Sequence, residues 1–260
     1  MLEVKNLSTY YYQEGKEVRA IDNISFSVGK GEVLGVLGES GSGKSTIAHS
    51  ILRLIAPPGK IAKGEMIFNS RDLLKLSEEE MIKVRGAKIS MIFQDPFTSL
   101  NPVYTVGDQI AEAIRLHQGL NKKDALEKAV QMLSIVHIKN PSERIHDYPH
   151  QFSGGMRQRV MIAMALACQP ELLIADEPTT ALDVTIQAEI LKLIKEIQSK
   201  FNLSVLYITH NFGIIKAICQ RVIVIYKGKV VEEGPVETVF SSPKDPYTQR
   251  LIKCLEVLKR

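Results

Sequence analysis

A run of glycine, serine and lysine near the beginning of the chain has the composition and spacing of a phosphate-binding loop. Residues 38–45 read Gly-Glu-Ser-Gly-Ser-Gly-Lys-Ser and fit the pattern G-x-x-x-x-G-K-[ST]. Glycines let backbone amides turn towards phosphate oxygens, and the helix expected to follow adds the positive end of its dipole. Lys44 is placed to reach the β- and γ-phosphates, and the Ser45 hydroxyl is placed to bind Mg²⁺. The alternative, a chance glycine-rich turn, is disfavoured because a strand precedes the loop.

A pair of carboxylates supplies the second candidate chemistry. Residues 171–176 form a short apolar strand that ends in Asp176, and Glu177 follows directly. Neighbouring side chains of an extended segment point in opposite directions, so the two acids cannot have the same role. We expect Asp176 to face Mg²⁺ beside Ser45 and Glu177 to face an attacking water, since ligands bind beyond the carboxyl ends of such strands. The alternative is a strand end that simply reaches solvent.

Strands and helices alternate around these residues, as hydrophobic periodicity and glycine or proline punctuation indicate. Residues 2–37 are β-rich and residues 97–167 mostly helical. The expected elements are strands at 33–37, 62–69, 88–94, 171–176 and 204–210, a helix at 44–55, a helix capped by Asp183, and a hairpin around Lys227-Gly228. This alternation implies an α/β fold with a mainly parallel sheet covered on both faces.

The helical stretch is the one expected internal boundary. We divide the chain into a core of residues 1–96 and 168–237, a helical subdomain of residues 97–167 and a short C-terminal tail of residues 238–260.

Composition excludes several classes of protein. Hydrophobic residues make up 45% of the chain and charged residues 24%, which argues against disorder. A net charge of +4, with 33 basic and 29 acidic residues, is too small and too scattered for a nucleic-acid surface. The longest apolar run, residues 160–168, is shorter than the ~18–20 residues of a membrane helix. Cys168, Cys219 and Cys254 form no CxxC pair, and the start shows no signal pattern, so we expect a reduced, cytoplasmic-type protein.

One motif points elsewhere and is rejected. Residues 121–124, Asn-Lys-Lys-Asp, match the N-K-x-D pattern that reads guanine in GTPases. That pattern should follow a buried strand downstream of the acidic strand, whereas this one precedes it. We therefore interpret Asn121 as the cap of an amphipathic helix.

A second glycine-rich helix start offers a second anion site. Residues 152–159 read Phe-Ser-Gly-Gly-Met-Arg-Gln-Arg, with Ser153 as an N-cap and two glycines that leave the first amides approachable. The alternative is that the two glycines only make the start of the helix more flexible and bind no anion. Here the sequence resembles the ATP-binding cassette (ABC) family, whose signature is LSGGQ. The resemblance implies that Ser153, Gly154 and Gly155 close over ATP held by the other subunit of a head-to-tail dimer.

The resemblance covers essentially the whole chain through motifs in a fixed order. It implies that Tyr11 stacks on adenine, that Gln94 contacts Mg²⁺ and the water, that Asp183 lies near the dimer seam, and that His210 is the switch histidine. The implied fold is a P-loop NTPase core with an N-terminal antiparallel β subdomain and an inserted helical subdomain. The implied cofactors are ATP and Mg²⁺. The nucleotide would be held by Tyr11, Gly38, Glu39, Ser40, Gly41, Ser42, Gly43, Lys44, Ser45, Thr46 and Gln94.

A narrower resemblance is to the peptide and nickel importers of this family, carried by residues 94–102, 148–159 and 245–251. In that branch Met156 commonly replaces the signature glutamine. The resemblance implies ATP hydrolysis that energises import of dipeptides, oligopeptides or nickel, with Lys44, Gln94, Glu177 and His210 as catalytic residues. Implied partners are a second, identical or paralogous ATPase subunit, two membrane permeases and an external solute-binding protein. The chain would lie at the cytoplasmic face of the membrane.

In that family a permease helix docks near residues 94–104, so Phe97, Leu100 and Tyr104 are candidate contacts; burial of the loop is the alternative. Two rival functions stay open. A non-transport cassette for DNA or ribosome work is disfavoured because no heptads separate Lys44 from Asp176 and only one set of motifs is present. A purely regulatory ATP-binding module is disfavoured by Glu177 and His210.

Overall fold

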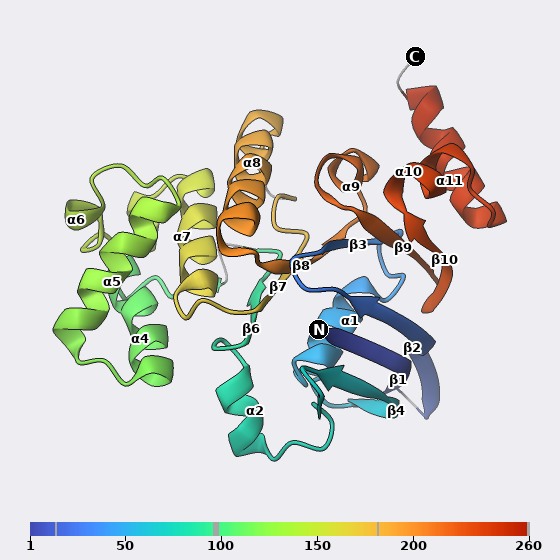
Figure 1. Ribbon diagram of the computed structural model, residues 1–260, viewed down its shortest axis with the longest axis horizontal. Coiled ribbons are helices and arrows are strands. Elements are labelled where there is room, and N and C mark those ends of the chain that lie inside the picture. Colours follow the sequence, from blue (N-terminus) through green and yellow to red (C-terminus); the bar gives the residue numbers. More distant parts are fainter. Residues whose placement is uncertain (14, 96–98, 181, 259–260) are drawn as a thin grey trace. The chain divides into compact units, whose positions relative to one another are not determined.

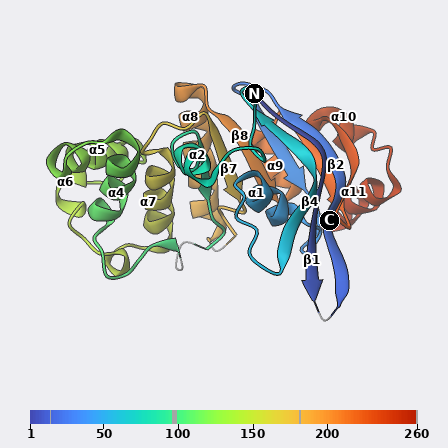
Figure 2. The ribbon, with the colours of Figure 1, turned by 90° about the horizontal axis from the view of Figure 1, so that it is seen from below.

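The computed structural model describes residues 1–13, 15–95, 99–180 and 182–258, which form two compact units (Figures 1 and 2). The first unit contains residues 1–77 and 204–260, and the second contains residues 78–203. The stretch of residues 97–167, expected to be helical, therefore lies inside the second unit. Each unit is described by itself.

An antiparallel sheet begins the first unit. Its strands are β1 (Leu2–Gln13), β2 (Lys16–Val28), β4 (Gly59–Phe68) and β5 (Arg71–Asp72), in the order β2-β1-β4-β5 (Figure 1). Alternating side chains of β2 are buried, Ile24, Phe26 and Val28 among them, as expected for a sheet with one covered face. This sheet confirms the predicted N-terminal antiparallel β region.

A second sheet of the same unit carries the phosphate loop. Strand β3 (Val33–Leu37) lies between β8 (Ser204–Thr209) and β9 (Arg221–Tyr226) and is parallel to both. Strand β10 (Lys229–Pro235) pairs with β9 in antiparallel fashion. Lys227 and Gly228 have φ values of 47° and 76°, the left-handed pair that a two-residue hairpin turn requires. The predicted hairpin is confirmed.

Among the described residues, the helices of the first unit are α1 (Lys44–Ile51), α9 (Phe212–Ile218), α10 (Val236–Ser241) and α11 (Pro246–Leu258). The prediction that the first helix continues to Ile55 is wrong. Arg53 has a left-handed φ of 53°, and its guanidinium donates hydrogen bonds to the carbonyl oxygens of Leu73 and Leu76. These contacts are made with residues 20 and 23 positions away, and they accompany the turn of the chain after α1.

The second unit contains β6 (Ile89–Ile92), parallel to β7 (Leu172–Asp176). Its helices are α2 (Glu78–Val84), α4 (Val106–Gln118), α5 (Lys122–Ile135), α6 (Pro141–Arg144), α7 (Gly154–Leu166), α8 (Val184–Phe201) and the 3₁₀ turn Pro149–Gln151. The helical character of residues 97–167 is confirmed for the described residues. Strand β6 ends two residues before the predicted end at Gln94.

Apolar stripes explain how these helices pack. For α8 the spacing predicts a buried stripe of Ile186, Ile190, Leu193, Ile194 and Ile197; the last four are buried and Ile186 is half-buried. For α5 the spacing predicts a buried stripe of Leu126, Ala129, Val130 and Leu133. Ala129 and Leu133 are buried as predicted, whereas Leu126 and Val130 are half-buried and Ala125 and Met132 complete the buried face. Helices α4, α5 and α7 contact one another, and α7 also contacts α8 (Figure 1).

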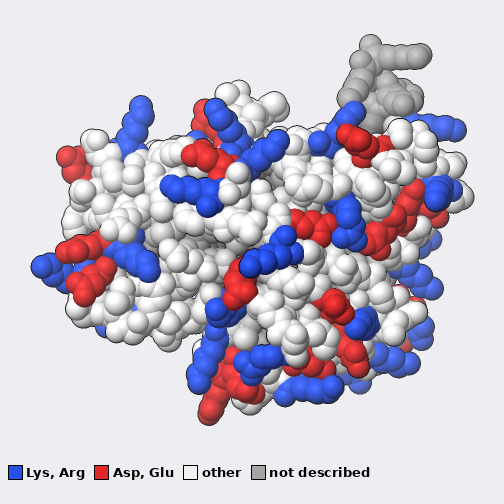
Figure 3. Space-filling view, in the orientation of Figure 1, with Lys and Arg blue, Asp and Glu red and all other residues white. Residues whose placement is uncertain are grey.

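The molecular surface carries both charges. On the face in Figure 3, basic and acidic side chains are interspersed. Within the described part of the chain, no helix has the length and hydropathy needed to cross a bilayer. Cys168 and Cys219 are free thiols, and burial raises the pKa of the Cys219 thiol to about 12, which keeps it protonated at neutral pH.

The Asn121 cap gives a direct test of local folding. The Asn121 side chain accepts a hydrogen bond from the Asp124 amide, 3.0 Å away, as the N-cap interpretation predicts. Replacing Asn121 with alanine should lower the free energy of unfolding by about 1 kcal/mol, because a helix-end amide loses its partner. Lys123→Ala, on the same first turn, is the control. Equal unfolding midpoints for the two variants in urea would contradict the assignment.

Candidate functional site

The phosphate loop connects β3 to α1, and two of its glycines leave no room for a side chain. Gly43 has a φ of 104°, and a Cβ there would lie 2.2 Å from the Ala20 carbonyl oxygen. A Cβ on Gly38 would lie 2.4 Å from the carbonyl oxygen of Ile225. Both obstacles are backbone atoms, so the loop needs glycine at these positions to lie this close to neighbouring strands.

Neighbouring strands and a helix also hold the loop by hydrogen bonds. The Gly228 amide, in the turn after β9, donates to the carbonyl oxygen of Ser42 at 3.0 Å. The Gly228 carbonyl in turn accepts from the Asp22 amide of β2. At the other end of the loop, the Glu39 amide donates to the Tyr247 hydroxyl of α11 at 3.3 Å. The loop conformation is therefore set by residues far away in sequence.

The interior of the loop is chemically suited to an anion. Lys44 is only 5% exposed, and its Nζ donates to the Glu39 carbonyl oxygen at 2.9 Å. The Ser42 hydroxyl is also buried and has no hydrogen-bond partner among the described residues. Burying a hydroxyl that has no hydrogen-bond partner is costly unless a ligand supplies one. With the first-turn amides of α1, these groups fit a phosphate.

Two further predicted residues belong to the first unit. Tyr11 is half-buried on β1, where a Cβ on Gly59 would lie 2.6 Å from its ring. Its neighbours are engaged elsewhere: the Tyr10 hydroxyl donates to Asp22, and the Tyr12 hydroxyl donates to Glu17. His210 is exposed and directly follows β8, as predicted, although the strand ends at Thr209.

The acidic pair ends strand β7 in the second unit. Asp176 is 4% exposed, whereas Glu177 is half-buried. Glu177 has a φ of 45°, so the extended geometry assumed for the pair ends at Asp176. A left-handed glutamate is uncommon, and such strain concentrates at functional positions. The backbone turn at Glu177 therefore separates the two carboxylates, and not the alternation of side chains along an extended strand that was predicted.

Two polar side chains orient the Glu177 carboxylate. The Gln94 amide nitrogen lies 3.4 Å from Glu177 Oε2, and the Thr180 hydroxyl donates to the same oxygen at 3.0 Å. The structure thus brings Gln94 and Glu177 together, although they are 83 residues apart. Thr180 is not among the residues predicted from the sequence. The one local feature that points to it is its spacing, because a residue three positions after Glu177 can contact it within one turn of the chain.

The second glycine-rich helix start lies in the same unit as the acids. Ser153 caps α7 as predicted, and its hydroxyl accepts from the Met156 amide. A Cβ on Gly155 would lie 2.6 Å from Ile186 of α8, whereas one on Gly154 would meet only an ordinary contact with Leu182. Gly155 is thus required for close packing, and Gly154 leaves the helix start accessible.

Residues 179–183 link the acids to α8. Asp183 is the N-cap of α8 and accepts from the Ile186 amide at 3.0 Å. The Gln187 side chain donates to the Thr179 hydroxyl. Ala181 lies outside the described residues.

The structure groups the predicted residues within the two units. Tyr11, the loop of residues 38–46 and His210 belong to the first unit, and Gln94, Ser153–Gly155, Asp176, Glu177 and Asp183 belong to the second. The predicted Mg²⁺ ligands are the hydroxyl of Ser45 and the oxygens of Gln94 and Asp176, hard donors of the kind that Mg²⁺ prefers. Among the described residues, no three His, Cys, Asp or Glu side chains gather as a metal site.

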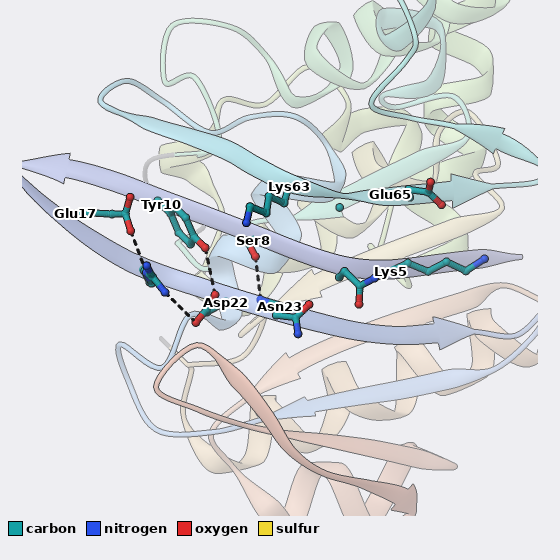
Figure 4. Close-up of a pocket in the computed structure, with 11 residues that line it drawn as sticks. Lys5, Ser8, Tyr10, Glu17, Asp22, Asn23, Lys63 and Glu65 are labelled. Carbon is teal, nitrogen blue, oxygen red and sulfur yellow. Dashed lines mark hydrogen bonds and ion pairs between the residues drawn. The ribbon is translucent and has the colours of Figure 1, made fainter.

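A separate hollow of about 780 Å³ lies on the antiparallel sheet (Figure 4). Three of its charged side chains pair with one another: Arg19 contacts Glu17 at 2.9 Å and Asp22 at 3.6 Å. Tyr10 also donates to Asp22, and the Asn23 amide donates to the Ser8 hydroxyl. We assign no ligand to this hollow.

Known proteins resemble the chain in sequence and structure. The family model described as ABC transporter matches residues 21–180. A probable peptide ABC transporter ATP-binding protein of Sinorhizobium fredii is 53% identical, over 100% of this chain and 78% of its own length. The dipeptide transport ATP-binding protein of Escherichia coli is 51% identical, over 98% of this chain and 78% of its own length.

A solved structure supports the fold independently. A dimeric ATP-binding cassette in a post-hydrolysis state, bound to ADP and phosphate, gives a TM-score of 0.80 at 28% identity and covers 91% of this chain and 99% of its own. The predicted fold class is confirmed.

The glycines of the loop can be compared with each other. Gly43→Ala should lower the free energy of unfolding by more than about 2 kcal/mol, because strain at φ 104° adds to the collision with Ala20. Gly41 also has a positive φ, of 76°, but nothing lies within 4 Å of a Cβ there. Gly41→Ala should therefore cost only about 1 kcal/mol. Chemical denaturation of both variants checks the order, and equal losses would contradict the assigned geometry.

Proposed function

The chain belongs to the ABC transporter family, and from this premise we propose that it is the ATP-hydrolysing subunit of a peptide importer. The observation that carries the proposal is the loop of residues 38–45, where a buried lysine and an unsatisfied buried hydroxyl lie within a glycine cradle. The printed names of the relatives, peptide and dipeptide transport ATP-binding proteins, support the cargo class.

We propose that residues of both units act on one nucleotide. Tyr11 would stack on adenine, and residues 38–46 would bind the phosphates through backbone amides and Lys44. Mg²⁺, held by the oxygens of Ser45, Gln94 and Asp176, would neutralise charge on the β- and γ-phosphates. Asp176 suits this role because it is a carboxylate at the carboxyl end of β7, beyond which ligands bind in open α/β sheets.

Hydrolysis would proceed by in-line attack of water on the γ-phosphorus. The water oxygen forms the new bond, the bond from the γ-phosphorus to the bridging oxygen breaks, and ADP leaves with that electron pair. Glu177 orients the water and accepts its proton. Gln94 and Thr180 support this role because both contact the Glu177 carboxylate. His210 would stabilise the γ-phosphate.

A second cassette would complete the site. Ser153, Gly154 and Gly155 begin α7, a helix of 13 residues whose first amides can bind an anion. We propose that they contact the γ-phosphate of ATP bound to the partner cassette in a head-to-tail dimer. The dimeric cassette with ADP and phosphate offers a precedent for assembly. A lone chain should accordingly hydrolyse ATP poorly.

Coupling to transport needs a surface for a permease. A groove of about 370 Å³ lies between Tyr104 and α4, with Asp108, Glu112 and Arg115 among its lining residues. Tyr104 is 56% exposed and Val103 is 71% exposed, so apolar surface is available at the groove. Leu100, another candidate contact, is 2% exposed and instead packs inside its unit; Phe97 lies outside the described residues.

The remaining parts of the proposal concern the assembly. We propose two permease subunits, an external solute-binding protein and a peripheral position on the cytoplasmic face of the membrane. A non-transport cassette, the first rival function, predicts ATPase activity without a permease. A regulatory module without turnover, the second, predicts ATP binding without hydrolysis. Measuring ATPase activity with and without reconstituted permeases separates all three.

The role of Glu177 can be tested by removing its charge alone. Glu177→Gln should leave ATP affinity unchanged while turnover of the assembled transporter falls by about 10²-fold or more, the scale of losing a general base. Glu171→Gln, just before the other end of β7, is the matched control and should keep normal turnover. Near-normal turnover in Glu177→Gln would reject the assigned role.

The docking groove can be tested by photo-crosslinking. A photo-activatable amino acid at Val103 should crosslink to a permease subunit in assembled transporters, because this side chain is exposed beside the groove. The same probe at Phe201, 40% exposed at the end of α8, serves as the control and should give no permease product. Crosslinking from both positions, or from neither, would count against docking at this groove.

A further inference from the structure

Helix α11 contacts the phosphate loop, although it begins two hundred residues later in the chain. The Tyr247 hydroxyl accepts a hydrogen bond from the Glu39 amide at 3.3 Å. The carbonyl oxygen of Glu39 accepts from Lys44 Nζ at 2.9 Å. Glu39 thus connects the tyrosine to the lysine through its own backbone. We propose that Tyr247 is a positioning residue for Lys44; the inference rests on the proposed nucleotide site.

The local sequence explains why Tyr247 points to the loop. The Asp245 carboxylate accepts from the amides of Tyr247 and Thr248, at 2.8 and 3.3 Å, and so caps the helix. Pro246 occupies the first helical position, where no amide is needed. The Glu232 carboxylate of β10 accepts from the amides of Lys244 and Asp245 and anchors this start to the sheet. These contacts give the Asp-Pro-Tyr-Thr motif a physical role.

Packing fixes the ring of Tyr247 as well. The ring is 6% exposed and stacks on Tyr226, the last residue of β9, with centroids 4.1 Å apart. Tyr247 shares a hydrophobic cluster with Leu37, which directly precedes the loop, and with Phe212, two residues after His210. The hydroxyl therefore approaches Glu39 from a ring that cannot move freely.

The hydrogen bond from the Glu39 amide to the Tyr247 hydroxyl links the phosphate loop directly to α11. A cavity of about 270 Å³ adjoins this hydrogen bond and is lined by Glu39, Tyr226, Tyr247, Arg250 and Leu251. Burial raises the pKa of the Tyr247 hydroxyl; the hydrogen bond from the Glu39 amide lowers it and the Glu39 carboxylate raises it, with a net rise. The hydroxyl therefore stays protonated at physiological pH.

This arrangement has a specific functional consequence. A loop whose first part is tethered holds the Glu39 carbonyl in place, and that carbonyl holds the Lys44 ammonium inside the cradle. Without the tether, the carbonyl is free to turn away, and the lysine must be reordered each time a phosphate binds. The structure thereby assigns to the C-terminal helix a part in ATP affinity.

The test uses the full-length chain and ATP binding by calorimetry. Tyr247→Phe keeps the stacked ring and removes the hydroxyl, and it should weaken ATP binding about threefold to tenfold, the range for one neutral hydrogen bond. Thr248→Val is the matched control: its hydroxyl is buried on the same helix and has no hydrogen-bond partner among the described residues. Its affinity should equal that of the wild type.

A double-mutant cycle distinguishes positioning from general destabilisation. In a Lys44→Ala background, Tyr247→Phe should change the remaining affinity by less than about 1.5-fold, because the tyrosine acts through the lysine. An undiminished effect in that background, or wild-type affinity in Tyr247→Phe alone, overturns the inference. Should Tyr247→Phe unfold, wild-type affinity in Asp245→Ala, which frees the helix start, would overturn it too. Retained affinity in Lys44→Ala alone would instead reject the proposed nucleotide site.

Discussion

The buried ammonium of Lys44 is the constraint on which the nucleotide site depends. A cation that is 5% exposed needs polar partners, and the Glu39 carbonyl oxygen supplies one of them. Keeping that carbonyl in place requires the loop to lie against Ala20 and Ile225, which only glycine permits at positions 43 and 38. The turn at Gly228 and the hydroxyl of Tyr247 then hold the loop ends. The glycines of the loop and its hydrogen bonds to distant residues therefore both help to hold the Lys44 ammonium in place.

Much of this arrangement could be predicted because its signals are local. The pattern of residues 38–45, the strand that ends at Asp176 and the caps Asn121, Ser153 and Asp183 each depend on a few neighbouring residues. Apolar runs located β3, β7 and β8 to within a residue or two, because buried parallel strands are continuously hydrophobic. The ABC resemblance then supplied the order of motifs, which spacing alone does not give.

The features that escaped prediction depend on contacts between distant residues. Helix α1 ends early because Arg53 bonds to carbonyl groups beyond position 70, and no periodicity signals this. Leu100 turned out to be buried rather than available to a partner, since a single apolar residue in a loop does not reveal its direction. The left-handed φ of Glu177 is equally silent in sequence, because glutamate carries no preference for it. Thr180 and Tyr247 become meaningful only once the fold places them.

The anchoring of the loop by Tyr247 also bears on biosynthesis. The loop leaves the ribosome early, but its partner hydroxyl lies 208 residues further along the chain. At translation rates of about 5–20 residues per second, the nascent chain spends roughly 10–40 seconds with the loop made and this anchor missing. During that interval the growing polypeptide should hold nucleotide weakly.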